Sequence, residues 1–246
     1  MSAVGVVGAW RGWSLSLYES AGEAGGSWTS GRGQSPPREG RADPERAAAE
    51  AARRAKAKIR RYCAGNRLNR LGTLTYRPPG CHDPKAIRAD LGVFFRQLRD
   101  LTGGKAFPYV WVPEWHKSDH GMHAHFAVGQ FIPRGLIEEA WGHGFVHIKL
   151  LGDLPVGSGR HAEARKAGGY LSKYAGKDFD KAKMPGLHRY EVAQGFTPEA
   201  VKLYAKTLEG VLTQANEIMG APACSWWVPQ LADGWDGPPV VSAQWA

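Results

Sequence analysis

The sequence predicts an α+β protein built on a ferredoxin-like β-α-β-β-α-β unit, with an antiparallel sheet covered by helices on one face and helical extensions at both ends. Three observations lead to this fold class. Apolar residues recur at helical spacing over residues 84–101 and 136–141. Short strand-like segments flank these helices, at residues 72–77, 107–115, 123–128 and 145–151. Their order along the chain is that of the split β-α-β-β-α-β motif.

The composition suits a folded protein with an anionic partner. Of the 246 residues, 43% are hydrophobic, which is ample for a core. The net charge of +9 favours binding to nucleic acid, although a basic protein without such a partner is a common alternative. The three cysteines lie far apart and fit neither a disulfide framework nor a CxxC zinc site. No run reaches membrane-spanning length and no signal peptide is recognisable, so we expect a cytoplasmic protein of a bacterial host with no membrane partner.

The first 66 residues precede the predicted catalytic core. We expect residues 1–42 to be a disordered extension because Gly, Ser, Pro and Arg dominate residues 20–40, although Trp13, Leu15 and Leu17 could support a short added strand. Residues 43–66 predict a helix, since Asp43 is a suitable N-cap and Pro44 suits the first helical position.

The second half of this helix is strongly basic. An unbroken run of positive side chains favours a phosphate-contacting surface over a merely solvated helix face, on which charges of both signs usually mix. We therefore assign nucleic-acid binding to Arg53, Arg54, Lys56, Lys58, Arg60 and Arg61.

Two histidines in an apolar strand predict a metal site. In a strand, His123 and His125 point to the same face. Glu114 lies on the preceding strand, and in a hairpin it would face one of these histidines at a Cβ distance of about 5 Å. We expect all three side chains on a helix-free face of the sheet. Two imidazoles and a carboxylate suit Mn²⁺, Mg²⁺ or Zn²⁺. Asp119 and His120 are rival third ligands, and an ordinary pair of surface or core histidines is the alternative.

A second group of functional side chains lies in residues 169–177. On a helix, two tyrosines and two lysines form a single stripe, which an amphipathic helix with half-buried tyrosines would also explain. A tyrosine hydroxyl, with a reference pKa near 10, is a poor nucleophile at neutral pH. Neighbouring lysines would favour the phenolate, and a metal ion that polarises a phosphate would lower the barrier to attack. The stripe consists of Tyr170, Lys173, Tyr174 and Lys177.

Three motifs in fixed order resemble those of the HUH endonucleases, and more narrowly those of the rolling-circle replication initiators of small plasmids and single-stranded-DNA phages. They are TLTY at residues 73–76, HAH at residues 123–125 and YLSKYAGK at residues 170–177. The resemblance covers about residues 61–180, and we expect the catalytic domain at residues 67–195. We also assign Thr75 and Tyr76 of the first motif to nucleic-acid binding.

The resemblance implies a function and roles for the residues of these motifs. Glu114, His123 and His125 would hold Mn²⁺ or Mg²⁺, and Tyr174 would nick one DNA strand at a replication origin. This step would leave a 5′-phosphotyrosine and a 3′-OH primer. Tyr170 would act as a second nucleophile, and both lysines of the third motif would assist.

Other functions and partners stay open. An HUH-type transposase or mobilisation relaxase would share the chemistry, and a non-catalytic nucleic-acid-binding module would share the fold. The expected partner is single-stranded DNA at an origin. Because the sequence has no GxxxxGK[ST] phosphate-binding loop, a host helicase and polymerase would have to assist.

The last segment, residues 196–246, predicts a helix over residues 197–219 followed by a tail rich in Trp. We expect both to pack on the catalytic domain, with Trp burial favoured over a base-stacking platform.

Overall fold

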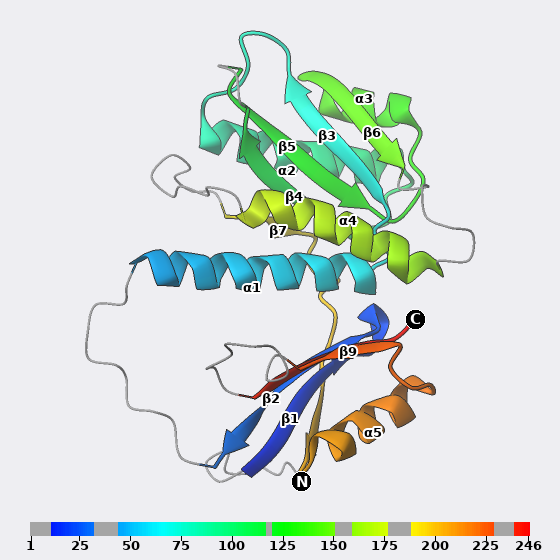
Figure 1. Cartoon of the computed structure of the whole chain (residues 1–246). Helices are drawn as coiled ribbons and strands as arrows, with labels where there is room; N and C mark the ends of the chain where they lie inside the picture. Colours follow the sequence, from blue (N-terminus) through cyan, green and yellow to red (C-terminus); the bar gives the residue numbers. More distant parts are fainter. Residues whose placement is uncertain (1–10, 32–43, 117–119, 151–158, 177–187, 229–238) are drawn as a thin grey trace, which may run out of the picture. The chain divides into compact units, whose positions relative to one another are not determined.

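The computed structural model describes residues 11–31, 44–116, 120–150, 159–176, 188–228 and 239–246. The chain divides into two compact units (Figure 1). The central unit is Pro44–Thr197, and the terminal unit joins Met1–Asp43 with Pro198–Ala246. The sites of interest all lie in the central unit.

The central unit contains the predicted β-α-β-β-α-β motif. In chain order its elements are α1 (Pro44–Gly65), β3 (Arg70–Tyr76), α2 (Pro84–Leu101), β4 (Tyr109–Trp115), β5 (Met122–Val128), α3 (Arg134–Trp141), β6 (Gly144–Leu150), α4 (Gly159–Gly176) and β7 (Glu191–Val192). The sheet order is β6-β3-β5-β4-β7, and every pairing is antiparallel. The α+β, ferredoxin-like fold class is therefore confirmed.

The strands alternate their side chains between two hydrophobic cores. On one face of the sheet, Ala124 and Phe126 of β5 pack with the apolar residues of α2 and α3. On the other face, Val110 and Val112 of β4 pack with residues of α1 and α4. The histidine face is thus not free of helices, contrary to our expectation, because α4 and α1 cover part of it. Helical spacing alone could not show which face a helix that follows the motif would cover.

A glycine permits the close approach of α1 to α4. A Cβ atom added at Gly168 of α4 would come within 2.8 Å of the Cα atom of Arg60 in α1. Real Cβ atoms do not approach backbone atoms this closely, so a larger residue would push the helices apart. The two helices lie side by side and run in opposite directions (Figure 1).

The terminal unit is a second antiparallel sheet with one described α-helix. Its strand order is β8-β1-β2-β10-β9. The elements are β1 (Arg11–Tyr18), the 3₁₀ turn η1 (Glu19–Ala21), β2 (Glu23–Ser30), β8 (Val201–Ala205), α5 (Leu208–Met219), β9 (Ser225–Trp227) and β10 (Val240–Gln244).

This unit corrects two expectations from the sequence. Residues 11–30 are not a disordered extension, since Leu15 and Leu17 of β1 are buried. Their strands pair with β8 and β10 from the other end of the chain, so local composition could not reveal them. Residues 201–205 are a strand and not the start of a helix, because Leu203 is 8% exposed whereas the neighbouring Tyr204 is 50% exposed. The C-terminal residues group with the N-terminal strands, and not with the central unit on which we expected them to pack.

The Trp-rich tail is only partly buried. Trp245 is 2% exposed, and its Nε1 donates hydrogen bonds to Asn216 Oδ1 at 3.1 Å and to the Ala221 carbonyl oxygen at 3.0 Å. Trp226 and Trp227 are 54% and 56% exposed. The expected burial is therefore confirmed for Trp245 and wrong for these two residues, while Trp235 lies outside the described residues.

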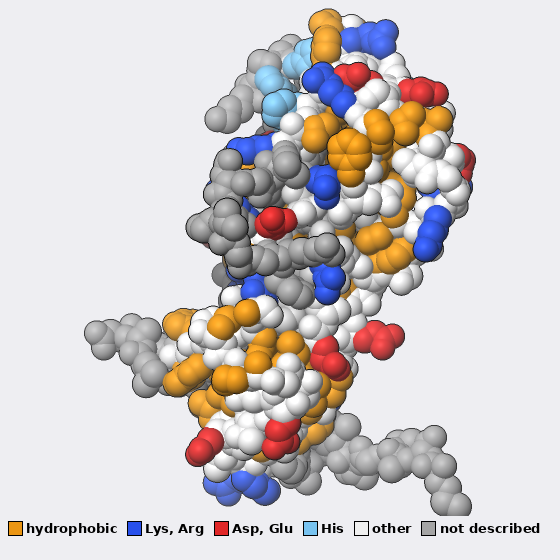
Figure 2. Space-filling view, turned by 90° about the vertical axis from the view of Figure 1, so that its right-hand side faces the viewer, with side chains coloured by type: hydrophobic (Ala, Val, Ile, Leu, Met, Phe, Trp, Pro, Cys, Tyr) orange, Lys and Arg blue, Asp and Glu red, His pale blue; other side chains and the backbone are white. Residues whose placement is uncertain are grey.

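Positive charge is concentrated in the central unit. The segments of the terminal unit hold six of the 32 Lys and Arg residues but nine of the 23 Asp and Glu residues. Lys and Arg side chains are spread over the face of the central unit that Figure 2 presents. No helix in the described part of the chain is long and apolar enough to cross a membrane.

Truncating a core aromatic residue at the middle of the sheet should destabilise the central unit. Phe126 is fully buried, and its ring lies 5.7 Å from that of Phe94. We expect Phe126→Ala to lower the free energy of unfolding by about 3–5 kcal/mol. The matched control is Phe131→Ala, because Phe131 is 75% exposed. Urea unfolding of both variants measures the difference, and equal losses would contradict the packing described above.

Candidate metal and tyrosine site

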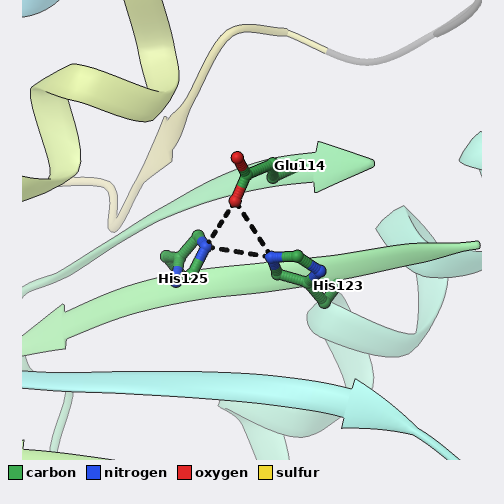
Figure 3. Close-up of side chains that lie close together, drawn as sticks. All are labelled: Glu114, His123 and His125. Atoms are coloured by element: carbon green, nitrogen blue, oxygen red, sulfur yellow. Dashed lines mark hydrogen bonds and ion pairs between the residues drawn. The ribbon is translucent and has the colours of Figure 1, made fainter. Parts of the chain in front are cut away.

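The register of the β4–β5 hairpin brings a carboxylate and two imidazoles together. Glu114 lies directly opposite His123, which confirms the predicted hairpin. Glu114 Oε2 is 2.9 Å from His125 Nε2 and 3.0 Å from His123 Nε2 (Figure 3). The two Nε2 atoms are 3.0 Å apart, and both histidines are less than a tenth exposed.

These residues fit a divalent metal ion. Each offers one ligand atom, and the three atoms lie within 4.8 Å of one another. Neutral imidazole nitrogens and an ionised carboxylate are ligands that Mn²⁺ and Zn²⁺ accept readily, and a site with three protein ligands leaves positions open for substrate oxygens.

The carboxyl group of Glu114 is ionised at neutral pH. Partial burial opposes its ionisation, but the hydrogen bonds with His123 and His125 outweigh this effect and lower its pKa to about 2. The carboxylate therefore keeps its negative charge at the point where the two imidazoles meet.

A threonine of the neighbouring strand holds one of the imidazoles. Thr73 pairs with His125 across β3 and β5, and its Oγ1 lies 3.0 Å from His125 Nδ1. If Nδ1 carries the proton and donates it to the hydroxyl, the lone pair of Nε2 faces Glu114 and His123. This is the usual way in which a second contact selects the tautomer of a metal-binding histidine.

Helix α4 places both predicted tyrosines beside the triad. The Tyr174 ring stacks on the His125 ring, with centroids 3.9 Å apart and planes inclined by 20°. The Tyr174 hydroxyl donates a hydrogen bond to the Tyr170 hydroxyl oxygen at 2.7 Å. The structure thus joins the second and third motifs into one site.

The electrostatic surroundings of Tyr174 differ from our expectation. Burial raises the pKa of its hydroxyl, and the hydrogen bond with Tyr170 and the charge of Glu114 raise it further. The neighbouring lysines do not reverse this effect. Lys173 is exposed on α4, and Lys177 lies outside the described residues.

A family model matches this part of the chain. Residues 69–179 match the family of replication-associated proteins of the ORF2 type. The matched segment is less than half of the chain, and it contains the triad and both tyrosines. It supports a protein of the replication-initiator type. No curated protein and no solved structure matches the chain significantly.

The first motif divides between the two faces of the sheet. Tyr76 was expected to bind nucleic acid, but it is 7% exposed on the opposite face, and its hydroxyl donates to Asp90 Oδ2 at 2.8 Å. Thr75 lies on the histidine face, paired with His123. The alternation of Thr and apolar residues in TLTY could have shown this division, and could also have pointed to Thr73.

The rival ligands are not part of the triad. Nε2 of His120 forms a hydrogen bond with the Tyr76 carbonyl oxygen at 2.7 Å, while Asp119 lies outside the described residues.

Sequence analysis also missed three exposed side chains of the edge strand β6. Phe145 pairs with Thr75 and His147 pairs with Thr73, so both lie on the face of the triad, and Lys149 follows at the next alternate position. Phe145 is 64% exposed. The alternation of residues 145–149 is the signal that would have identified this group.

The basic helix keeps its predicted side chains in solvent. Five of the six side chains that we assigned to nucleic-acid binding are exposed, and Arg61 is half-buried. Arg54 forms an ion pair with Glu50 one turn earlier, at 3.7 Å, so the run is less purely basic than residues 53–61 alone indicate.

Removing the hydroxyl of Thr73 should weaken metal binding. We expect Thr73→Val to lower the affinity for Mn²⁺ by about 10–100-fold, since it removes the hydrogen bond that orients His125. Thr75→Val is the matched control for metal affinity, because Thr75 occupies the same strand and face but its side chain contacts neither imidazole through a described hydrogen bond. Isothermal titration calorimetry measures both affinities. Equal affinities of the two variants would show that Thr73 does not position His125.

Proposed function

We propose that the protein is a metal-dependent DNA nicking and joining endonuclease of the HUH type that starts rolling-circle replication. The observation that carries this proposal is the stacking of Tyr174 on His125, which puts a nucleophile against a ligand of the candidate metal site. The family match over residues 69–179 supports it, because both groups lie in the matched segment. We assign the catalytic domain to residues 67–195 and a DNA-contacting role to the basic helix that precedes it.

The triad would hold Mn²⁺ or Mg²⁺. When bound, such an ion polarises a phosphate oxygen and so favours attack at phosphorus. The chain itself supplies the ionised carboxylate of Glu114, two imidazoles with converging nitrogens, and the hydroxyl of Thr73 that orients His125.

Tyr174 would perform the first transesterification. Its phenol loses its proton to solvent, and the oxygen attacks the scissile phosphorus. The bond between phosphorus and the 3′ oxygen breaks, and that oxygen takes up a proton to become the 3′-OH primer. The 5′ side of the cut strand stays attached as a phosphotyrosine. Tyr170 lies within hydrogen-bond distance of Tyr174, so it can reach the same place for a second, closing step.

The DNA would approach over the open part of the histidine face. The exposed Phe145 ring beside Thr75 offers a stacking contact for a base. The positive side chains of α1 and of the central unit would contact phosphates. We further propose that a host helicase unwinds the duplex and a host polymerase extends the primer.

Covalent adduct formation tests the proposal directly. The protein is incubated with single-stranded DNA from its own replicon and Mn²⁺, and the products are separated on a denaturing gel. We expect a protein–DNA adduct and a free 3′-OH fragment, both of which EDTA should abolish. Adduct formation on the ends of a mobile element, without a neighbouring origin, would favour a transposase or relaxase. DNA binding without any adduct would favour a non-catalytic module.

Loss of the imidazoles should separate cutting from binding. We expect His123→Ala combined with His125→Ala to abolish nicking and to leave the affinity for single-stranded DNA largely unchanged, because these side chains would act on one phosphate and would not hold the strand. Nicking is measured on gels and binding by fluorescence anisotropy. Full cleavage by the double variant would contradict the metal-dependent mechanism.

The two tyrosines should have different roles. We expect Tyr174→Phe to lose initial nicking, since the Tyr174 ring is the one stacked on His125. Tyr170→Phe should still nick once but terminate poorly, because the second nucleophile is absent. Peptide mapping of the first-turnover adduct decides between them. A phosphotyrosine at Tyr170 alone would reverse the assignment, and modification of neither residue would rule out the covalent mechanism.

A further inference from the structure

A pocket with several positive side chains lies between α1 and the chain just before β7. Its volume is about 330 Å³, at the lower end of the usual range for small-molecule sites. Its floor is formed by alanines of α1. The functional side chains around it are Arg54 and Lys58 of α1, followed by His188, Arg189 and Tyr190. The described residues that line it include no carboxylate.

The tertiary structure places this pocket near the proposed nucleophile. Because α1 and α4 run in opposite directions, the N-terminal half of α1 lies beside the C-terminal end of α4 (Figure 1). Arg189 connects the two places, since it donates a hydrogen bond from Nη1 to the carbonyl oxygen of Ala175 at 3.1 Å. Ala175 directly follows Tyr174, so a strand attached to Tyr174 would begin close to this pocket.

The chemistry of the lining suits a nucleotide within a strand. Arginine and lysine side chains bind phosphate oxygens, and an aromatic ring can stack on a base. Glu50 competes for Arg54, but this ion pair is long and both side chains are about half exposed or more, so it holds Arg54 only weakly. Tyr190 is half-buried against the core of α1 and α4, which gives its ring a fixed place at the pocket.

We propose that this pocket binds a nucleotide of the single-stranded DNA that flanks the scissile phosphate, through its phosphate and its base. The proposal rests on the proposed nicking function and deepens it, because it makes the residues of the basic helix unequal. Arg54 and Lys58 lie one helical turn apart and line the pocket, whereas Arg53 and Lys56 do not. A diffuse electrostatic surface would use both pairs alike.

A comparison of two double variants tests the pocket. The probe is a fluorescein-labelled oligothymidine of about 15 nucleotides, a length within the usual site size of single-strand binders. Binding is measured by anisotropy in EDTA, so that no cleavage interferes. The test variant combines Arg54→Gln with Lys58→Gln, and the control combines Arg53→Gln with Lys56→Gln. Both remove two charges from exposed positions of the same helix.

The pocket predicts unequal losses. The test variant should bind about tenfold or more weakly at about 100 mM NaCl, and its log–log salt dependence should flatten by about 1.4, or 0.7 for each lost phosphate contact. The control should lose less than about threefold. Equal losses in the two variants, or no loss in the test variant, would overturn the proposal.

The aromatic contact has its own measurement. Tyr190→Leu should weaken binding several-fold without changing the salt dependence, and Tyr190→Phe should restore it, because stacking needs the ring and not the hydroxyl. Equal affinities of the Leu and Phe variants would remove the base from the proposal. Circular dichroism confirms that each variant is folded. Lys58→Arg keeps the charge and should bind like the unmodified protein, and a loss as large as that of Lys58→Gln would contradict a contact through charge.

This test is separate from that of the nicking function. Adduct formation by the unmodified protein decides the nicking function, and the variant comparison in EDTA decides the pocket. An unmodified protein that forms the adduct, together with equal losses in the two double variants, would overturn the pocket alone.

Discussion

The site depends on the pairing register of three neighbouring strands. Antiparallel pairing of β4 with β5 sets Glu114 opposite His123, and pairing of β5 with β3 sets Thr73 opposite His125. Side chains in a strand alternate between faces, so a shift of either pairing by one residue would send these groups to opposite sides of the sheet. The apolar residues between them prevent such a shift, because Ala124 and Phe126 are fully buried on the other face. The core that stabilises the sheet therefore also holds the candidate ligands in place.

The second constraint is the packing of α4 between the sheet and α1. Leu171 and Ala175 of α4 are fully buried in the core shared with α1, while Tyr170 and Tyr174 remain partly accessible beside the triad. Gly168 allows α1 to come close on the other side. One helix thus carries the proposed nucleophile and also supports the basic helix. This arrangement explains how a segment before the sheet and a segment after it can serve the same strand of DNA.

The sequence was informative where the relevant contacts are local or follow from periodicity. The helix of residues 84–101 has apolar residues at helical spacing, and the HAH strand needed only its alternation to predict two imidazoles on one face. It was least informative for the terminal unit. β1 pairs with β8, and these strands come from opposite ends of the chain. The Gly and Ser residues around them predict a linker when they are read alone, and only the pairing makes them a sheet. Tyr76 was misassigned because its motif was read as a unit, although alternation sends its side chain into the core of α2 and α3.

The sequence by itself determined the β-α-β-β-α-β order, the basic helix, the histidine pair with its upstream glutamate, and the tyrosine stripe. All of these follow from residue type and spacing along a single element or hairpin. Only the tertiary structure decided that α4 lies on the histidine face, that Thr73 contacts His125, and that Arg54 and Lys58 share a pocket with His188, Arg189 and Tyr190. These contacts join elements distant in the chain, and their geometry is set by the burial of apolar surfaces in three dimensions, which no local pattern records.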